Sequence, residues 1–370
     1  MKRTGARHLT VWICAIVCGS IWGPGLAGAQ TARTNDTLAQ ATRGIEALQR
    51  WYDPSTGLYK GTGWWNSANA LTTLADYARI GGSHAYDGTL ANSFEQAQKT
   101  NAGFLNEFYD DEGWWALAWI DAYDLTGERR YRTAAEAIFL NMAGGWDQTC
   151  GGGIWWSKER KYKNAIANEL FLSVAAHLAN RDKMRKSEFL GWANREWQWF
   201  QHSGMINRQG RINDGLKIEQ NEKGVQVCRN NGSTEWSYNQ GVVLGGLVEL
   251  ARADHDRSLP VEAGRVATAA ITKLTDSQGI LHDECEPQCN ADAVQFKGIF
   301  VRNLAALNHA YPRTEYATFL RTNAESVWQR AQGSQTQFGV VWSGPFDTAD
   351  AGTQSSAVDA LVAGAVASRQ

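Results

Sequence analysis

The 370-residue sequence has little net charge, little proline and, beyond its first thirty residues, no long apolar run. Its 36 Lys+Arg and 38 Asp+Glu residues give a formal net charge of -2. A nucleic-acid-binding protein needs a basic surface, so this balance argues against that class. With only 6 Pro and 43% hydrophobic residues, the composition is not that of a disordered chain. The remaining class is a large globular protein of enzyme size.

The sequence also lacks the signatures of several enzyme classes. It contains no G-x-S-x-G elbow, phosphate-binding loop, dinucleotide-binding G-x-G-x-x-G or metalloprotease H-E-x-x-H motif. The histidines are scattered, and His177 and His309 fall late in predicted helices, where we interpret them as packing residues. A sugar epimerase would need a pair of histidines in its cleft. We therefore predict neither a cofactor nor a metal.

The first 29 residues have the order of a secretory signal peptide. A basic start (Lys2, Arg3, Arg7) precedes an apolar run from Leu9 to Ile21 and the small residues Ala27-Gly28-Ala29. A membrane anchor is the alternative, but Gly19 and Pro24 interrupt the run before roughly 20 apolar residues accumulate. We expect cleavage after residue 29 and a soluble, secreted chain of residues 30–370. No later segment is apolar enough to span a bilayer, and the C-terminus lacks the hydrophobic tail of a GPI signal.

Four cysteines follow the predicted signal peptide. In an oxidising compartment an even number suggests two disulfides. The short CEPQC segment favours a Cys285–Cys289 pair, which leaves Cys150 with Cys228. A zinc site at CEPQC is less favoured, because no second Cys/His cluster completes a tetrahedral set. Asn35 and Asn231 begin N-glycosylation sequons.

Helical periodicity dominates residues 30–370. Six segments are apolar almost all round, which predicts burial on most faces; they begin at Trp64, Asp110, Asn164, Glu235, Phe296 and Asp350. More charged, amphipathic helices lie between them, for example those beginning at Thr34, Glu128, Lys186, Ser258 and Arg313. The alternation predicts a single all-α domain, an (α/α)6 barrel of six inner and six outer helices. An irregular helical array is the alternative.

The turns that enter the inner helices are rich in tryptophan, amides and charge, and the chain has 17 Trp in total. In such a barrel these turns meet at one end and form a cleft. Indole faces stack on sugar rings and amides bind hydroxyls, so we predict a carbohydrate site. The candidate binding residues are Trp65, Asn66, Asn69, Trp115, Asn164, Asn168, Glu169, Trp236, Tyr238, Asn239, Gln240, Lys297 and Arg302. Helix capping and core packing are the alternative roles for these residues.

Two adjacent carboxylates, Asp110 and Asp111, begin an otherwise apolar inner helix. Capping and the helix dipole would explain such a pair structurally. The same position also suits catalysis, because adjacent residues diverge by about 100° around a helix axis. Their carboxyl groups would then lie roughly 5–6 Å apart, the separation of a retaining glycosidase. Mutual repulsion would raise one pKa and supply a proton donor.

Four motifs resemble those of glycoside hydrolase family 76, which comprises endo-α-1,6-mannanases and related fungal wall-remodelling enzymes. They are YDDEGWWALAWIDAYDLTG, CGGGIWWS, YKNAIANELFLSVAAHL and EWSYNQGVVLGGLVELA, in that order, within a resemblance that runs from about Thr34 to the C-terminus. The resemblance implies an (α/α)6 fold and a retaining mechanism. It implies that Asp110 is the nucleophile and that Asp111 protonates the leaving oxygen and then activates water.

Three functional hypotheses follow. The first is a secreted, monomeric endo-α-1,6-mannanase that needs no cofactor and acts on α-1,6-mannan or a mannosylated glycan. The second is a transglycosidase of the same fold that builds cell-wall linkages on mannosylated GPI-type glycans. The third is a non-catalytic mannan-binding protein. The missing C-terminal anchor favours the free hydrolase. We expect the protein to be secreted and extracellular, with association with the cell wall as the alternative.

Overall fold

The alternation of apolar and amphipathic segments produces twelve α-helices in the described part of the chain. The computed structural model describes, apart from Met1, the backbone of residues 24–369 and the side chains of residues 36–369. The predicted signal peptide and the side chain of Asn35 lie outside the described side chains.

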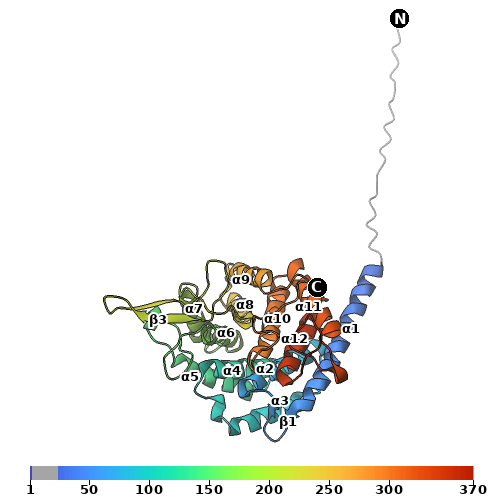
Figure 1. The fold of residues 1–370 in the computed structure, drawn as a ribbon, viewed down its shortest axis with the longest axis horizontal. Coiled ribbons are helices and arrows are strands. Elements are labelled where there is room, and N and C mark those ends of the chain that lie inside the picture. The colour runs from blue at the N-terminus through green and yellow to red at the C-terminus, as the bar shows by residue number, and fades with distance from the viewer. Residues whose placement is uncertain (2–23, 370) are drawn as a thin grey trace.

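Six helices form an inner ring. They are α2 (Trp64–Gly81), α4 (Tyr109–Thr126), α6 (Ala165–Arg181), α8 (Ser237–Asp254), α10 (Phe296–Ala310) and α12 (Ala351–Ala367). Each packs against the next, and α12 packs back against α2, so the ring is closed. Figure 1 shows these helices around the centre of the molecule. The inner segments predicted from all-round apolar character are confirmed.

The other six helices surround this ring. They are α1 (Pro24–Leu48), α3 (Asp87–Gln96), α5 (Arg129–Ala143), α7 (Lys186–Phe200), α9 (Leu259–Lys273) and α11 (Thr314–Arg330). In Figure 1 they lie toward the edge of the molecule. The predicted (α/α)6 barrel is thus confirmed. Helix α3 had no counterpart among the outer segments named from the sequence, because only Leu90 and Ser93 of its ten residues are buried.

Glycine allows the inner helices to approach closely. A Cβ atom on Gly241 of α8 would lie 2.6 Å from Cα of Phe300 on α10. A Cβ on Gly298 of α10 would lie 2.5 Å from Cα of Ser356 on α12. Neither backbone could accept a side chain without moving, so these glycines set the spacing of the ring.

Amide side chains hold the turns that lead into the helices. Ile154, Ile212 and Phe338 each form an isolated β-bridge in the connection between an outer helix and the next inner helix. Their backbone N–H groups donate to Asn168 at 2.7 Å, Gln240 at 2.8 Å and Gln354 at 3.0 Å, respectively. Since buried backbone groups must be paired, these amides fix the turns at the end of the barrel where the site lies.

Short strands and two disulfides complete the described fold. Strands β1 (Tyr52–Asp53) and β2 (Leu58–Tyr59) pair with each other, as do β3 (Leu216–Gln220) and β4 (Gln226–Asn230), both antiparallel. The β3–β4 hairpin projects from the barrel in Figure 1. A disulfide joins its Cys228 to Cys150, with Cα atoms 5.5 Å apart, and a second joins Cys285 to Cys289. Both predicted pairs are present.

Short 3₁₀ helices lie in the connections between these elements. They are η1 (Gln49–Trp51), η2 (Ala97–Lys99), η3 (Ala102–Phe104), η4 (Thr149–Gly151), η5 (Ala293–Gln295) and η6 (Ser334–Thr336). Among the described residues, no helix has both the length and the apolar character needed to cross a bilayer.

Candidate active site

Asp110 and Asp111 lie in the first turn of α4, and both are half-buried. The N-cap of this helix is Phe108, whose own N–H donates to Asn106 Oδ1 at 2.8 Å. Neither aspartate is therefore the capping residue considered from the sequence. Both remain close to the positive end of the helix dipole, which favours a carboxylate.

Each carboxylate accepts a hydrogen bond from a different loop. Trp156 Nε1 donates to Asp110 Oδ2 at 3.0 Å, and Asn106 Nδ2 donates to Asp111 Oδ2 at 2.6 Å. Oδ1 of Asp110 is buried and has no hydrogen-bond partner among the described residues. An unpaired buried oxygen is costly, which is the situation expected of a group that meets a ligand.

The environment of the pair favours protonation. Burial raises the pKa of Asp110 well above its ordinary value, and the charge of Asp111 raises it further, against the donation from Trp156. Burial also raises the pKa of Asp111, to about 6, against the donation from Asn106. The pair therefore holds a proton at mildly acidic pH, as two interacting carboxyl groups do. Such a pair can supply both a proton donor and a nucleophilic carboxylate.

A third carboxylate, that of Asp292, lies near the pair. Its charge raises the pKa of Asp111, and its Oδ1 accepts a hydrogen bond from Trp65 Nε1 at 2.9 Å. Trp65 was a predicted site residue, and this bond places it beside the carboxylates. Asp292 was not predicted, because it belongs to an irregular loop before η5 with no pattern that marks it.

Asp214 belongs to a second acidic cluster at this end of the barrel. It accepts a hydrogen bond from the Tyr162 hydroxyl at 2.5 Å. Burial raises the pKa of Tyr238, and the charges of Asp214, Asp110 and Glu169 raise it further. These four groups therefore share one neighbourhood. Asp214 and Tyr162, like Asp292, were missed from the sequence.

Two predicted residues in this region are buried and unpaired. Within the described residues, both carboxyl oxygens of Glu169 and both polar side-chain atoms of Asn239 lack hydrogen-bond partners. Burial raises the pKa of Glu169 well above its ordinary value. Groups of this kind are expected to meet water or a hydroxyl-rich ligand.

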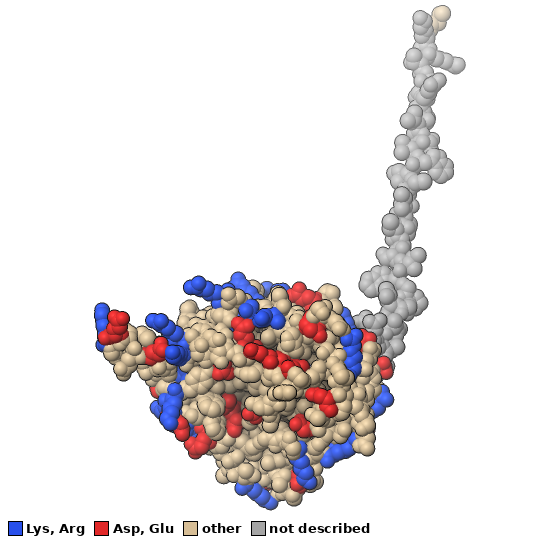
Figure 2. Space-filling model, viewed as in Figure 1, with Lys and Arg blue, Asp and Glu red and all other residues tan. Residues whose placement is uncertain are grey.

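Aromatic rings form the walls of the same region. Trp65 stacks on Trp114 with ring centres 5.6 Å apart, and Trp114 faces Tyr238 at 6.5 Å. On the other side, Trp156 packs on Phe108 at 4.9 Å, and these rings are 37% and 36% exposed. Exposed indole faces beside carboxylates are what a sugar ring requires. Figure 2 shows acidic side chains gathered around the hollowed middle of this face, with basic ones at its edge.

Several predicted binding residues instead have structural roles. Trp115 is fully buried and packs on Phe104 and Trp119, between the inner and outer helices, so its assignment to the cleft is wrong. Lys297 is buried as well, and its Nζ contacts Glu286 at 2.6 Å and the carbonyl of Val340 at 2.6 Å. Its ammonium group is thereby bound by other groups of the protein.

The amides at helix starts are mostly committed to backbone groups. Asn164 caps α6 through Ala167 N–H, and Asn168 bonds only to backbone atoms. Gln240 holds Ile212 through both its amide atoms. The sequence could not distinguish these roles from sugar binding, because the same amide serves either purpose. For Asn164, Asn168 and Gln240 the structural alternative is the correct one.

The remaining predicted residues lie below or beside the aromatic walls. Asn66 donates to Gln295 at 2.9 Å, and Trp236 packs edge-on against Phe296. Arg302 contacts Asp359 at 3.3 Å and donates to Asn69. Arg302 also lies 5.8 Å from the ring centre of Trp114. Arg302 thus links Asn69 and Asp359 to the ring of Trp114.

A buried lysine shapes the glycine-rich turn that carries Trp156. Nζ of Lys163 contacts Asp147 Oδ1 at 2.9 Å and the carbonyls of Thr149, Gly152 and Gly153 at 2.7–2.8 Å. Four oxygens around one ammonium group fix the path of the turn. Asp147 also accepts from Trp155 Nε1 at 2.7 Å.

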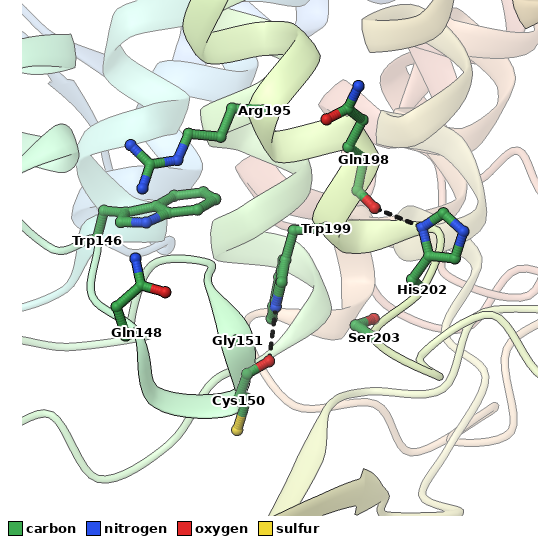
Figure 3. Close-up of a pocket in the computed structure, with 9 residues that line it drawn as sticks. All are labelled: Trp146, Gln148, Cys150, Gly151, Arg195, Gln198, Trp199, His202 and Ser203. Carbon is green, nitrogen blue, oxygen red and sulfur yellow. Dashed lines mark hydrogen bonds between the residues drawn. The ribbon is translucent and has the colours of Figure 1, made fainter.

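A cavity of about 450 Å³ opens on the side of this turn that faces α7. Figure 3 shows its lining residues: Trp146, Gln148, Cys150, Gly151, Arg195, Gln198, Trp199, His202 and Ser203. The guanidinium of Arg195 lies 4.5 Å from the ring centre of Trp146 and covers it. None of the carboxylates described above lines this cavity, so we do not assign the reaction to it.

Comparison with known proteins gives one family. The model of glycosyl hydrolase family 76 matches residues 36–370. The chain is 27% identical over 277 residues to mannan endo-1,6-alpha-mannosidase DCW1 of Candida albicans, covering 68% of this chain and 60% of that protein. It is 25% identical over 337 residues to the DFG5 protein of the same organism, covering 81% and 72%. The match thus spans less than two thirds of the first relative.

Solved structures share the fold. The α-1,6-mannanase GH76A of Salegentibacter sp. HEL1_6, an inactive variant with two consecutive aspartates replaced by asparagine, was solved with α-1,6-mannotriose. It aligns with a TM-score of 0.80 at 23% identity, over 90% of this chain and 100% of that one. Dfg5 from Chaetomium thermophilum, in complex with glucosamine, aligns with a TM-score of 0.76 at 20% identity, over 90% of each chain.

Proposed function

The chain is a member of glycosyl hydrolase family 76, and we propose that it hydrolyses α-1,6-linked mannan internally, with retention, through Asp110 and Asp111. The observation that carries this proposal is the consecutive pair of half-buried, separately hydrogen-bonded carboxylates at the start of α4. Its relatives are named mannan endo-1,6-alpha-mannosidases. The Salegentibacter mannanase is described as inactive when two consecutive aspartates are replaced.

The proposed reaction has two steps. Asp110 attacks the anomeric carbon, the bond to the leaving oxygen breaks, and Asp111 gives its proton to that oxygen. A glycosyl ester on Asp110 results. Asp111 then takes a proton from water, whose oxygen displaces Asp110 from the anomeric carbon and restores both groups. The tryptophan-lined walls and the unpaired polar groups of Glu169 and Asn239 would contact the sugar.

The division of roles rests on the family resemblance and has a direct test. Alanine at the nucleophile position leaves space for azide, which attacks the opposite face and gives the β-mannosyl azide. Alanine at the acid/base position lets azide intercept the ester and gives the α-mannosyl azide. We expect the β product from Asp110→Ala and the α product from Asp111→Ala. The reverse outcome would exchange the two roles.

Transglycosylation is the second candidate function. The observation that favours it is the likeness to Dfg5, whose structure contains glucosamine. Hydrolysis creates one new reducing end for each bond broken, whereas transfer to a sugar acceptor creates none. Reducing ends and product lengths measured with and without a glucosamine-containing acceptor therefore separate the two. A non-catalytic mannan-binding protein would bind the polymer and yield no product in either assay.

The proposed enzyme acts outside the cell as a monomer, with residues 30–370 as one catalytic domain. The two disulfides support an oxidising compartment. Glycosylation remains a prediction; Asn231 Nδ2 already donates to Tyr162 at 2.8 Å, which gives that residue a structural role. Mass spectrometry of the secreted chain would locate the cleavage site and any glycan, and light scattering would give its oligomeric state.

A further inference from the structure

We propose that the ion pair between buried Glu112 and half-buried Lys158 is a positioning device that aligns both catalytic carboxylates. The inference rests on the proposed function of Asp110 and Asp111. Neither Glu112 nor Lys158 touches the reacting atoms in this account. They act through the two loops whose side chains donate to the aspartates.

Glu112 follows the catalytic pair directly but is directed away from it. Its side chain is fully buried, whereas the side chain of Lys158 is 31% exposed. Oε1 contacts Lys158 Nζ at 3.0 Å and accepts from the N–H of Asn106 at 3.1 Å. Oε2 accepts from Asn141 Nδ2 at 2.5 Å. All of these contacts are made inside the protein, so Glu112 joins three segments at one carboxylate.

Two of these segments are joined along their backbones. Phe108 and Ser157 form an isolated antiparallel bridge. Tyr109 N–H donates to the carbonyl of Trp156 at 2.9 Å, and Lys158 N–H donates to the carbonyl of Glu107 at 3.0 Å. The Glu112–Lys158 ion pair lies across this bridge. It connects α4 to both of the backbone segments that the bridge joins. A shift of one segment therefore moves the other.

The joined segments carry the two donors to the catalytic pair. Asn106, on one segment, donates to Asp111, and Trp156, on the other, donates to Asp110. Glu112 holds the backbone N–H of Asn106 itself. The ion pair therefore reaches each donor by a short path: Glu112 binds the backbone N–H of Asn106, and Lys158 follows Trp156 by two residues. Misplacing reactive groups by about 1 Å can cost roughly 100-fold in rate.

The ionisation of Glu112 depends on the ammonium group of Lys158. Burial raises its pKa, and the hydrogen bond and charge of Lys158 oppose that rise. Without the ammonium group, the buried carboxylate would keep only its neutral donors, Asn106 N–H and Asn141 Nδ2, and would have no opposite charge beside it, which is unfavourable. The loop that holds Lys158 would then no longer be drawn toward α4.

The test compares Lys158→Met, Lys158→Arg and a control, Lys161→Met, whose side chain is 77% exposed. On linear α-1,6-manno-oligosaccharides we expect Lys158→Met to lower kcat by about 10- to 100-fold, with KM changed less than twofold. Lys158→Arg should recover most of the loss, and the control should match the wild type. If Lys158→Met lost activity only by unfolding, its Tm and the fraction of active enzyme would fall instead. In that case Lys158→Arg would not restore kcat selectively over KM.

A double-mutant cycle tests whether Lys158 acts through Asn106. If it does, Lys158→Met adds little to the loss in an Asn106→Ala background, because the contact it aligns is already gone. Full additivity of the two losses would overturn the proposed route. Wild-type kcat in Lys158→Met would overturn the proposal altogether.

A crystal structure of Lys158→Met gives a readout that does not depend on the substrate. We expect the Asn106–Asp111 and Trp156–Asp110 hydrogen bonds to lengthen or break, and unchanged geometry would refute the positioning role. If the wild type acts on no α-1,6-mannan while these bonds do change, the function proposed above fails and the positioning inference stands.

Discussion

The indole Nε1 of Trp156 donates to Oδ2 of Asp110 at 3.0 Å, across 46 positions of sequence. The bond joins helix α4 to a glycine-rich turn that is itself held by buried Lys163. One carboxylate of the pair is thus oriented by an element outside its own helix. A hydrogen bond to a charged group contributes about 1.5–3 kcal/mol.

Replacing Trp156 with phenylalanine keeps most of the ring surface and removes the N–H donor. We expect kcat on α-1,6-mannan to fall by roughly 10- to 100-fold, because the ionised form of Asp110 loses its donor. The same substitution at Trp328, on outer helix α11, is the matched control. Equal activity of the two variants would show that the indole N–H has no part in catalysis.

The pH dependence should reflect the raised pKa of Asp111. Its folded-state pKa is about 6, so its proton is present below that pH and lost above it. We expect kcat/KM to fall as pH rises above about 6. Asn106 lowers the pKa of Asp111 by stabilising its ionised form, so Asn106→Ala should move this limb to higher pH. Besides burial, the charges of Asp292 and Glu112 raise the pKa of Asp111, and the remaining charged neighbour is Asp110, which is also acidic. A limb that stays in place, or moves to lower pH, contradicts this assignment.

We expect Lys163 to stabilise the whole protein against unfolding, as well as to fix the path of the glycine-rich turn. Lys163→Met leaves three carbonyls and Asp147 without their buried cation, which should lower the free energy of unfolding by about 3 kcal/mol. Chemical denaturation measures the loss. Lys161→Met, at an exposed neighbour, should change it by less than about 0.5 kcal/mol. Similar effects of the two substitutions would mean that the oxygen cage around Lys163 is not stabilising.

The two disulfides should contribute unequally. Cys150 and Cys228 are separated by 78 positions, and Cys285 and Cys289 by 4. In the chain-entropy account, the longer loop stabilises by about 4.5 kcal/mol and the shorter by about 2 kcal/mol. Paired Cys→Ser variants, compared by Tm, should therefore show the larger loss for the first bond. The opposite order would indicate that the short loop is constrained by its surroundings instead.

The fold could be predicted because burial leaves a strong periodic pattern. Helices such as α8 and α12 are apolar or small on every side, as a fully enclosed helix must be. Helix α3 escaped prediction because only Leu90 and Ser93 of its ten residues are fully buried, so it carries no such pattern. Its Phe94 packs on Phe104 and Trp119, contacts that only the folded chain reveals.

The candidate site could be predicted only in part. Adjacent acids at the start of an apolar helix are visible in the sequence, so Asp110 and Asp111 stood out. Their donors and neighbours, Asn106, Trp156 and Asp292, come from irregular loops that meet only when the ring closes. Trp115 was predicted to bind substrate but is buried in the core, because an indole at a helix start can face either a ligand or the core.

The most direct test of the account is product analysis after incubation of linear α-1,6-mannan with wild type, Asp110→Asn and Asp111→Asn. We predict short manno-oligosaccharides from the wild type, no product from either variant, and folded variants with unchanged or higher Tm, since each loses a buried, repelled charge. Wild-type rates of cleavage by both folded variants would contradict the assignment of the reaction to this pair of carboxylates.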